Sequence, residues 1–311
     1  MKQNLLLPLL VFLGITNLIS QPYIDKAYQD YIDKYPVGQA LTTWDKMMLS
    51  SLPEMEASGD DLRRELPYMV DNSALPHMRP VLFQMGASCG QACAVGHNFT
   101  YEINAVRGLP ADTSSNQYAT HFTWNFMNGG KGWYGVSYFH SFEILRLCGN
   151  PNVNDYGGSY YDDGKRWMTG YDAYYNSMKN RIAGAYKIKT DTEEGILALK
   201  NWVYDHLGKS VVGGVASFYA NVPYNAVLLN DTTPEGGKHV LTEWYPNPTH
   251  ALTVVGYNDS VRWDYNGDGM YTNHLDLNED GVIDPKDWEI GAVKIVNSHG
   301  VNQLDSGYCY M

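Results

Sequence analysis

The sequence contains no run of Lys or Arg residues, and its formal net charge is −12 over 311 residues. A surface that binds nucleic acid must neutralise phosphates, so this absence argues against DNA or RNA as a partner. Cysteine is scarce, with 4 residues, which is too few for a disulfide framework. No segment beyond the N-terminal one is long and apolar enough to span a membrane, and no repeat typical of solenoid proteins is visible.

What is present indicates an exported globular protein. Apolar residues make up 44% of the chain and charged residues 18%, a balance typical of a folded domain. The chain begins with Lys2, continues with a mostly apolar run from Leu5 to Ile19, and reaches the small residue Ser20. This pattern predicts a signal peptide over residues 1–20, and therefore a secreted or periplasmic protein with no membrane contact after cleavage.

Residues 21–65 are polar and compatible with helices, and they carry no evident catalytic set. They are either an N-terminal extension or a short pro-region, with a loose boundary at Gly59, Asp60 and Asp61. From Leu66 onward helical patterns come first and strand patterns second, which predicts an α+β fold with a helical lobe and a sheet lobe. The expected helices cover 89–107, 141–147 and 192–207 (capped by Thr192), and the expected strands cover 210–217, 250–257 and 292–298.

Cys89 stands at the start of the first of these helices, five residues after Gln84. The free N–H groups and the positive dipole end of a helix start favour a thiolate, so Cys89 is a candidate nucleophile. A cysteine hydrolase also needs a histidine to exchange the proton and a group that orients this histidine. His250 opens one apolar strand and Asn297 ends another; each residue taken alone is more often structural.

Together these motifs resemble the papain-like cysteine peptidases. Gln84, Cys89, Ala92, Ala94 and Val95 are similar to the family's Gln…Cys-Trp-Ala-Phe-Ser-Ala-Val block. The segments 128–130 (Asn-Gly-Gly), 250–257 (His-Ala…Val-Gly-Tyr) and 297–300 (Asn-Ser-His-Gly) resemble three further family motifs and occur in the family's order. The resemblance covers residues 66–311 and implies a two-lobed fold, with an active-site cleft between a helical lobe and an antiparallel β lobe.

The resemblance also implies roles for these residues. Cys89 would be the nucleophile, His250 its acid–base partner and Asn297 the residue that orients His250. Gln84 and the Cys89 N–H would hold the oxyanion, and Asn128, Gly129 and Gly130 would form a wall of the site for polypeptide substrates.

The sequence departs from the family pattern at three positions. Cys93 competes with Cys89 as the nucleophile, although alignment of the neighbouring residues favours Cys89. Gly90 stands where the family has Trp after the nucleophile, and His299 stands where the family has the Trp that shields the Asn–His hydrogen bond. These departures keep open an alternative, an inactive papain-like protein that binds peptides without cutting them.

The segment 258–289 is an insertion relative to the family and contains two loops with the spacing of EF-hand or dockerin-type calcium sites. Such loops could also serve adhesion or scaffolding, but their position within the domain argues against that reading. The prediction is a structural Ca²⁺ that ties the insertion down near Asn297. The second loop offers Asp276, Asn278, Asp280, Val282 (carbonyl), Asp284 and Asp287, and the first, less complete loop offers Asp264, Asn266, Asp268, Met270 and Thr272, with a nearby carboxylate needed to complete it.

Overall fold

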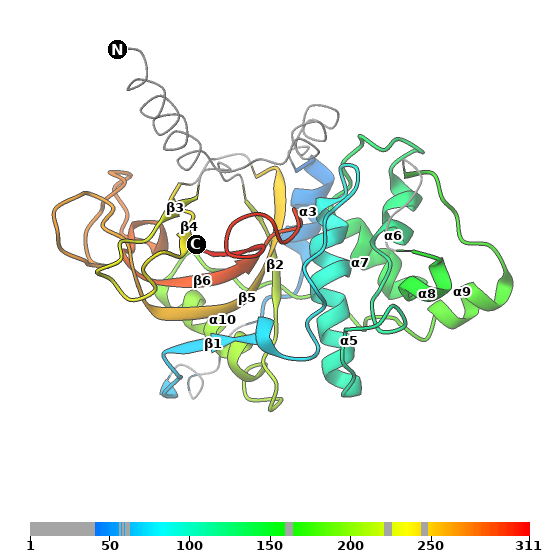
Figure 1. Cartoon of the computed structure of the whole chain (residues 1–311), viewed down its shortest axis with the longest axis horizontal. Helices are drawn as coiled ribbons and strands as arrows, with labels where there is room; N and C mark the ends of the chain where they lie inside the picture. Colours follow the sequence, from blue (N-terminus) through cyan, green and yellow to red (C-terminus); the bar gives the residue numbers. More distant parts are fainter. Residues whose placement is uncertain are drawn as a thin grey trace, which may run out of the picture. The chain divides into compact units, whose positions relative to one another are not determined.

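The computed structural model describes residues 41–55, 57, 59, 63–158, 164–220, 226–243 and 248–311 (Figure 1). The predicted signal peptide and two residues of the predicted boundary, Asp60 and Asp61, lie outside the described residues. Within the described part of the chain, no helix is long and apolar enough to cross a membrane.

Most of the described helices lie in the first two thirds of the chain and form the helical lobe, as expected, whereas α10 (Glu193–Asp205) packs against the sheet. One continuous helical rod carries Cys89 at its start and ends at Gly108, which adopts the left-handed conformation that terminates helices (φ 64°). This rod consists of α4 (Cys89–Gln91), the π-helical η3 (Ala92–Phe99) and α5 (Thr100–Arg107). The other helices are α3 (Thr43–Ser51), η2 (Asn72–Ala74), α6 (Thr120–Met127), α7 (Tyr138–Leu147), α8 (Val153–Tyr156), α9 (Tyr171–Ser177), α10 (Glu193–Asp205) and η5 (Pro285–Asp287).

The sheet lobe is a seven-stranded sheet organised around β5. β5 pairs with β6 along one side and with β1 and β2 along the other, all antiparallel, while β4 and β7 form a parallel pair. The predicted antiparallel lobe is thus confirmed except for this one parallel pair. The strands are β1 (Met69–Asp71), β2 (Ala216–Ala220), β3 (Val227–Leu228), β4 (His239–Val240), β5 (His250–Arg262), β6 (Ile290–Val296) and β7 (Tyr308–Tyr310).

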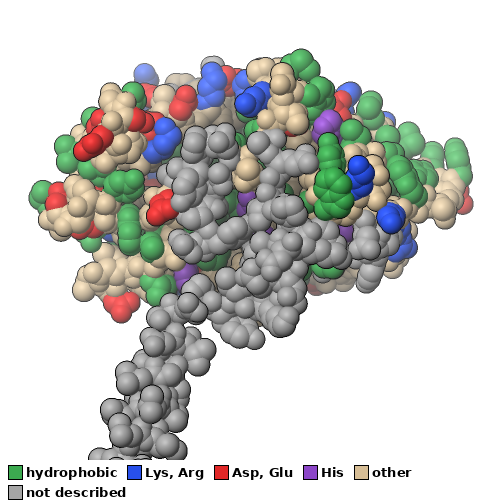
Figure 2. All heavy atoms as spheres, turned by 90° about the horizontal axis from the view of Figure 1, so that it is seen from above, with side chains coloured by type: hydrophobic (Ala, Val, Ile, Leu, Met, Phe, Trp, Pro, Cys, Tyr) green, Lys and Arg blue, Asp and Glu red, His purple; other side chains and the backbone are tan. Residues whose placement is uncertain are grey.

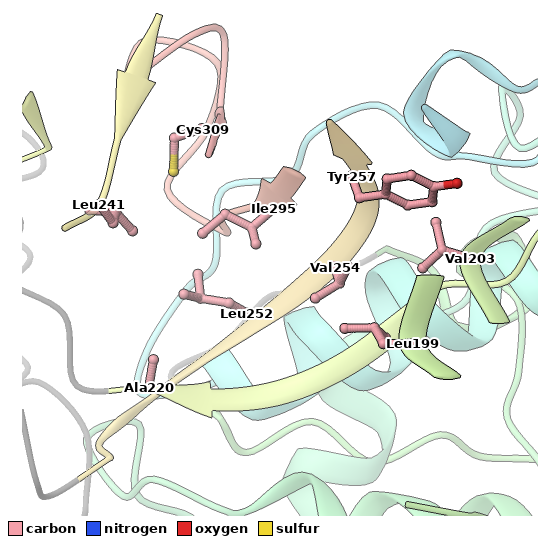
Figure 3. Packing of buried hydrophobic residues seen from close by; sticks show 9 residues of the cluster. All are labelled: Leu199, Val203, Ala220, Leu241, Leu252, Val254, Tyr257, Ile295 and Cys309. Carbon is pink, nitrogen blue, oxygen red and sulfur yellow. The ribbon is translucent and has the colours of Figure 1, made fainter. Parts of the chain in front are cut away.

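Both faces of β5 are covered over residues 250–257, which explains why this part of the strand is a largely apolar run. Leu252 and Val254 point into a core shared with α10, which contributes Leu199 and Val203 (Figure 3). Residues on the opposite face pack against the helical rod; Ala251, for example, lies in a cluster with Cys93 and Ala94. The strand therefore joins the two lobes, and a one-residue slip in its register would exchange these two faces.

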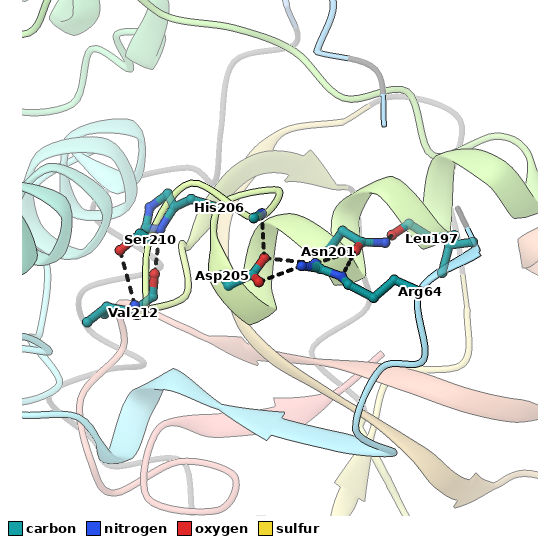
Figure 4. A network of polar contacts seen from close by, with 8 residues as sticks. Arg64, Leu197, Asn201, Asp205, His206, Ser210 and Val212 are labelled. Atoms are coloured by element: carbon teal, nitrogen blue, oxygen red, sulfur yellow. Dashed lines mark hydrogen bonds and ion pairs between the residues drawn. The ribbon is translucent and has the colours of Figure 1, made fainter. Parts of the chain in front are cut away.

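A polar network anchors the beginning of the sheet lobe to α10 (Figure 4). The Arg64 guanidinium donates to both carboxylate oxygens of Asp205, at 2.6 and 2.8 Å, and to the Asn201 side chain. At the end of α10, both ring nitrogens of His206 face acceptors: Nδ1 lies 2.6 Å from the Val212 carbonyl oxygen and Nε2 lies 2.8 Å from Glu102. Because a carbonyl oxygen and a carboxylate both accept hydrogen bonds, this geometry favours the protonated form of His206, in which both ring nitrogens donate.

The structure corrects one expected strand. Residues 210–215 were expected to be extended, but the strand β2 begins only at Ala216. Gly213 lies so close to α10 that a Cβ atom would stand 1.8 Å from the Val203 carbonyl oxygen. Only glycine permits this approach, so the Gly-Gly pair packs against a helix instead of entering the sheet.

Candidate active site

The nucleophile candidate Cys89 is the first residue of the helical rod. The preceding Ser88 turns back, its hydroxyl donating to the Met85 carbonyl oxygen at 2.8 Å, so the chain enters the helix through a tight loop. Cys89 is partly exposed, whereas Gly90 and Gln91 behind it are buried. The positive end of the helix and its free N–H groups therefore lie at the Cys89 thiol.

Three side chains from different elements lie together at this point. The Cys89 thiol lies near His250 at the start of β5, where each residue shifts the pKa of the other. His250 Nε2 lies 2.8 Å from Asn297 Oδ1, just after β6. The same oxygen accepts the Ser298 N–H at 2.7 Å, which fixes the orientation of the amide. Since an amide oxygen only accepts, Nε2 donates and Nδ1 is left to face the sulfur.

Mutual charge stabilisation shifts both pKa values toward an ion pair. Burial is the largest influence on Cys89 and would raise the thiol pKa, but His250 and the N–H groups of Ala251 and Gly90 outweigh it, so the pKa lies below its ordinary value. Burial would likewise lower the pKa of His250, but Cys89 and Asn297 reverse this and the net pKa is raised. The arrangement therefore favours a thiolate beside an imidazolium.

The second thiol, Cys93, is chemically different. It is buried, and its Sγ donates to the Leu252 carbonyl oxygen at 2.8 Å and accepts from the Thr253 hydroxyl at 3.2 Å. Burial raises the pKa of Cys93 to about 12, so this thiol stays protonated at neutral pH. Of the two cysteines that the sequence left in competition, only Cys89 has the environment of a nucleophile.

Gln84 lies next to Asn297 across a short backbone pairing. Its N–H donates to the Ser298 carbonyl oxygen at 2.7 Å, and its side-chain Oε1 accepts the Ser298 hydroxyl at 2.5 Å. The side-chain nitrogen donates to the Gly86 carbonyl oxygen at 3.1 Å. The Gln84 amide is therefore held rigidly in the loop that enters the Cys89 helix, with its nitrogen as the donor end.

The space beside Gly90 is filled by a neighbouring segment. A Cβ atom at residue 90 would lie 2.7 Å from the Val136 carbonyl oxygen and 3.4 Å from the Tyr219 hydroxyl. This hydroxyl accepts the Tyr138 N–H at 2.9 Å, and the two tyrosine rings stack at 4.3 Å. Sequence reasoning missed Tyr138 and Tyr219 because the two residues lie far apart in the sequence and match no motif. The glycine is thus a steric requirement of this chain.

His299 covers His250. Their rings are nearly parallel, at an angle of 21°, with centroids 4.9 Å apart, and each residue is only 5% exposed. Backbone pairing with Phe83 holds His299 in the same short ladder that holds Gln84. Position 299 thus presents an aromatic face to His250, although the ring is an imidazole.

The predicted substrate wall is adjacent to the Cys89 loop, since the Ala87 N–H donates to the Gly132 carbonyl oxygen at 3.0 Å. The Asn128 side chain is buried and accepts the Gly130 N–H at 2.8 Å, so it shapes the turn from inside. Gly129 and Gly130 have positive φ values, 63° and 72°, and a Cβ atom at either would meet nothing within 4 Å. The two glycines, and not the asparagine side chain, therefore form the open surface of this turn.

The second acidic loop is internally hydrogen-bonded in an EF-hand-like pattern. Asp276 at position 1 accepts the Gly281 N–H at position 6, at 2.9 Å. Asp287 at position 12 is buried and accepts the N–H groups of Leu277 and Asp284, at 3.0 and 2.9 Å. Asn278 and Asp280 accept further loop N–H groups within the same turn.

The first loop repeats this pattern with a carboxylate from outside its own span. Asp264 accepts the Gly269 N–H at 2.8 Å. The buried Glu289 accepts the N–H groups of Tyr265 and Thr272, at 2.7 and 2.9 Å, at the same loop positions that Asp287 serves in the second loop. Sequence analysis anticipated a nearby carboxylate but did not identify Glu289, because it falls well beyond the twelve-residue loop.

Two further predicted ligands of the first loop accept hydrogen bonds from N–H groups within the loop. Asn266 accepts the Asp268 N–H at 3.0 Å and Asp268 accepts the Met270 N–H at 2.7 Å. Figure 2 shows Asp and Glu side chains at the left end of the molecule, where Figure 1 places the segment between β5 and β6. Among the described residues no three His, Cys, Asp or Glu side chains converge as a ready metal-binding group.

No protein-family model matches the sequence, and no curated protein matches it either. Solved structures, in contrast, do match this chain. Xylellain, a cysteine protease from Xylella fastidiosa, is 13% identical, with a TM-score of 0.56 over 89% of this chain and 90% of that one. The chain has the papain-like fold.

Two proenzymes share the papain-like fold with this chain. Digestive procathepsin L 3 of the Tenebrio molitor larval midgut is 12% identical, with a TM-score of 0.51 over 93% of this chain and 88% of that one. The recombinant stem bromelain precursor is 13% identical, with a TM-score of 0.51 over 97% of this chain and 91% of that one. At these identities the likeness establishes the papain-like fold and leaves activity to the residues of the site.

Proposed function

We propose that this protein is a cysteine peptidase in which Cys89 is the nucleophile, His250 the acid–base group and Asn297 the orienting residue. The observation that carries the proposal is the grouping of Cys89 with His250, whose ring in turn bonds to Asn297; it joins the helix start to two strands of the sheet. A partly exposed thiol with a lowered pKa at such a position is typical of a nucleophile.

The reaction would be acyl transfer in two stages. The Cys89 thiolate attacks the peptide carbonyl carbon, the C–N bond breaks, and His250 gives its proton to the departing amine. Water then attacks the acyl-enzyme, His250 takes one of its protons, and a carboxylic acid leaves while the thiolate is restored. Throughout, Asn297 keeps the His250 ring directed at the sulfur.

The oxyanion would be held by the Cys89 N–H and the side-chain nitrogen of Gln84. Two contacts fix this side chain, one with the Ser298 hydroxyl and one with the Gly86 carbonyl oxygen, and the Gln84 backbone is bound to Ser298, so the donor end is already ordered before substrate arrives. Donors that need no reorganisation during the reaction stabilise developing negative charge most effectively.

The alternative function is that of an inactive peptide-binding protein. It was suggested by the departures from the family pattern at Gly90 and His299. The steric contacts of Gly90 account for that residue without any loss of the site, because the 136–138 segment occupies the place of a side chain. His299 still places an aromatic ring on His250. Neither departure removes a group that the acyl transfer needs.

Alkylation with iodoacetamide followed by peptide mapping tests the proposal. We expect rapid labelling of native protein at Cys89, labelling of Cys93 only after denaturation, and hydrolysis of casein that Cys89→Ala abolishes and Cys93→Ala retains. Native Cys89 that reacts no faster than in the denatured chain would refute the peptidase. Binding of casein without cleavage, together with slow labelling, would support the inactive alternative.

We further propose that the protein is exported and that Ca²⁺ stabilises the segment between β5 and β6. The donor set is carboxylate, amide and backbone oxygen, which suits calcium. In the second loop the ion would be held by Asp276, Asn278, Asp280, the Val282 carbonyl, Asp284 and Asp287, and in the first by Asp264, Asn266, Asp268, the Met270 carbonyl, Thr272 and Glu289.

Thermal unfolding with added calcium or with EGTA tests this part separately. Calcium should raise the melting temperature of the wild-type protein and of Glu279→Gln, whose exposed side chain stands at a non-ligand position. Asp276→Ala should lose most of the response. An EGTA-treated wild type with unchanged stability and casein hydrolysis would contradict a calcium role. Export predicts that the protein recovered from its natural source begins near residue 21.

A further inference from the structure

The described part of the N-terminal extension, residues 41–55, packs on the helical lobe beside Cys89. Its apolar side chains recur at helical spacing and contact one hydrophobic cluster; they are Leu41, Trp44, Met48 and Leu52. The same cluster holds Tyr138, and Cys89 packs against it. The Trp44 ring also lies parallel to the His140 ring, with centroids 3.9 Å apart. Residues 41–55 are therefore joined to the lobe that carries the nucleophile.

Both ends of α3 are bound to other segments of the chain. At its start the buried Asp45, only 4% exposed, accepts the N–H and the hydroxyl of Thr42 at 2.8 and 2.6 Å, and it accepts the Ser137 hydroxyl as well. At its end the Lys187 ammonium donates to two carbonyl oxygens of the last turn, while the Lys187 carbonyl oxygen accepts the Met55 N–H at 2.8 Å. A buried carboxylate that accepts several donors forms strong, charge-assisted hydrogen bonds, so its contact with Ser137 fixes the relative position of the two segments.

Ser137 lies in the middle of the segment that fills the space beside Gly90. The Val136 carbonyl oxygen in this segment accepts the Gln91 side-chain N–H at 3.0 Å, and the backbone of the segment leaves no room for a side chain at Gly90. Ser137 precedes α7, but its hydroxyl does not cap that helix and is directed to Asp45 instead. The segment is thus held between the first turn of the nucleophile helix on one side and α3 on the other.

We propose that residues 41–55 remain part of the active enzyme and that Asp45 is a positioning residue, which holds the first turn of the Cys89 helix in place through Ser137. The inference rests on the proposed peptidase function. It chooses between the two interpretations that the sequence leaves open for residues 21–65, because a removable pro-region would take the Asp45 contact away with it. Removal of such a segment would loosen the nucleophile instead of releasing it.

Loss of the Asp45 carboxylate would take from Ser137 its acceptor and release the segment on the side of α3. The first turn of the nucleophile helix would then shift, because Gln91 in that turn is bound to the same segment. Burial, the largest influence on the Cys89 pKa, raises it, and His250 and two N–H groups outweigh burial only at close range. A displaced thiol would therefore have a higher pKa and form less thiolate.

Rates of iodoacetamide alkylation at native Cys89 test the positioning role. Asp45→Ala should slow alkylation at mildly acidic pH by roughly 3- to 30-fold, a coupling typical of residues in contact. Ser137→Ala should have a similar effect, and adding it to Asp45→Ala should cost less than about twofold more, because both variants break one contact. Asp45→Asn keeps an acceptor for Ser137 and should restore most of the rate, although it weakens the Thr42 cap and lowers stability. Asp172→Ala, which removes an exposed carboxylate from the first turn of α9, is the matched control and should react like wild type.

The acid limb of the alkylation profile separates positioning from a purely structural role. It should lie at higher pH in Asp45→Ala and Ser137→Ala than in wild type, with all proteins shown to remain folded by near-UV circular dichroism. Loss of the Asp45 charge alone would lower the thiol pKa and shift the limb in the opposite direction, so the sign identifies displacement of the thiol. The other titratable groups near Cys89, Cys93 in η3 and Tyr219 in β2, have raised pKa values and stay neutral.

Sequencing of the active protein tests whether residues 41–55 are retained. The protein that is alkylated at Cys89 and hydrolyses casein should still contain them. Activity that appears only after their removal, or an alkylation rate and acid limb unchanged in both Asp45→Ala and Ser137→Ala, would overturn the inference and leave the peptidase intact. If neither variant folds, retention or loss of residues 41–55 in the active protein decides the question. A wild-type Cys89 that is not activated with these residues present or removed would overturn both proposals.

Discussion

Substitution of Gly90 by alanine is the sharpest test of how the site is packed. Gly90 lies in the helix α4, where alanine would ordinarily stabilise the chain by about 1 kcal/mol relative to glycine. Here the added Cβ would stand 2.7 Å from the Val136 carbonyl oxygen and 3.2 Å from the Tyr138 nitrogen. Both are backbone atoms, so neither can yield by a simple side-chain rotation.

The expected change in the stability of Gly90→Ala follows from these opposing effects. Forcing a methyl group into a filled space costs about 1–3 kcal/mol, and after the helical gain of about 1 kcal/mol the net loss of stability is up to about 2 kcal/mol. The movement that relieves the contact would displace the Tyr138 N–H from the Tyr219 hydroxyl and shift the first turn of the Cys89 helix. We therefore expect slower alkylation of Cys89 as well as lower stability.

Urea unfolding followed by tryptophan fluorescence measures the first effect, with Gly184→Ala as the control. A Cβ atom at Gly184 would meet only the Tyr186 ring at 3.8 Å, so this variant should be as stable as wild type or slightly more so. A Gly90→Ala protein that matches Gly184→Ala in stability and wild type in alkylation rate would show that the Val136–Tyr138 segment does not restrict this position.

Further predictions concern the anchors between the helices and the sheet. The ion pair of His206 with Glu102 raises the pKa of His206 above its ordinary value, although burial, the largest single influence, acts in the opposite direction. Its contribution to stability should be fully present below about pH 6.5 and should be lost as the pH rises through the raised value, so urea unfolding across this range should show a decline that His206→Gln abolishes. Arg64→Met should lower stability by roughly 1–3 kcal/mol because it leaves the Asp205 carboxylate without its charged partner, whereas Arg63→Met, at an exposed residue, should have little effect. Equal urea midpoints for the two arginine variants would contradict this.

Sequence patterns predicted the parts of the fold that depend on periodicity and helix ends. The helix from Cys89 to Gly108 is confirmed, and so is α10, whose cap Thr192 accepts the Gly195 N–H. The apolar run of β5 predicted a strand because a strand covered on both faces has no polar alternation. The strand predicted over residues 210–215 was wrong because strand propensity does not show how closely Gly213 approaches a helix.

The sequence predicted which residues are candidates for the site but not how these residues are arranged in space. Motif order indicated Cys89, His250 and Asn297, but the hydrogen bond between the last two depends on the register of β5 against β6, which the sequence does not display. Tyr219 and Glu289 lay outside every motif, since their partners come from distant segments. The difference between Cys89 and Cys93 became clear only from burial and from the Leu252 carbonyl that accepts from Cys93.

The division of the site between the helical rod and the sheet has a consequence for synthesis of the chain. Cys89 is translated long before His250 and Asn297, and the Asn297 N–H is itself bound by the Gly307 carbonyl oxygen near the chain end. At ordinary translation rates the thiol would wait on the order of ten seconds or more for its partners. Until β7 has joined the sheet, neither His250 nor Gln84 is held in place beside Cys89. The order of the elements along the chain therefore delays the pairing of Cys89 with His250 and Asn297 until β7 has been made.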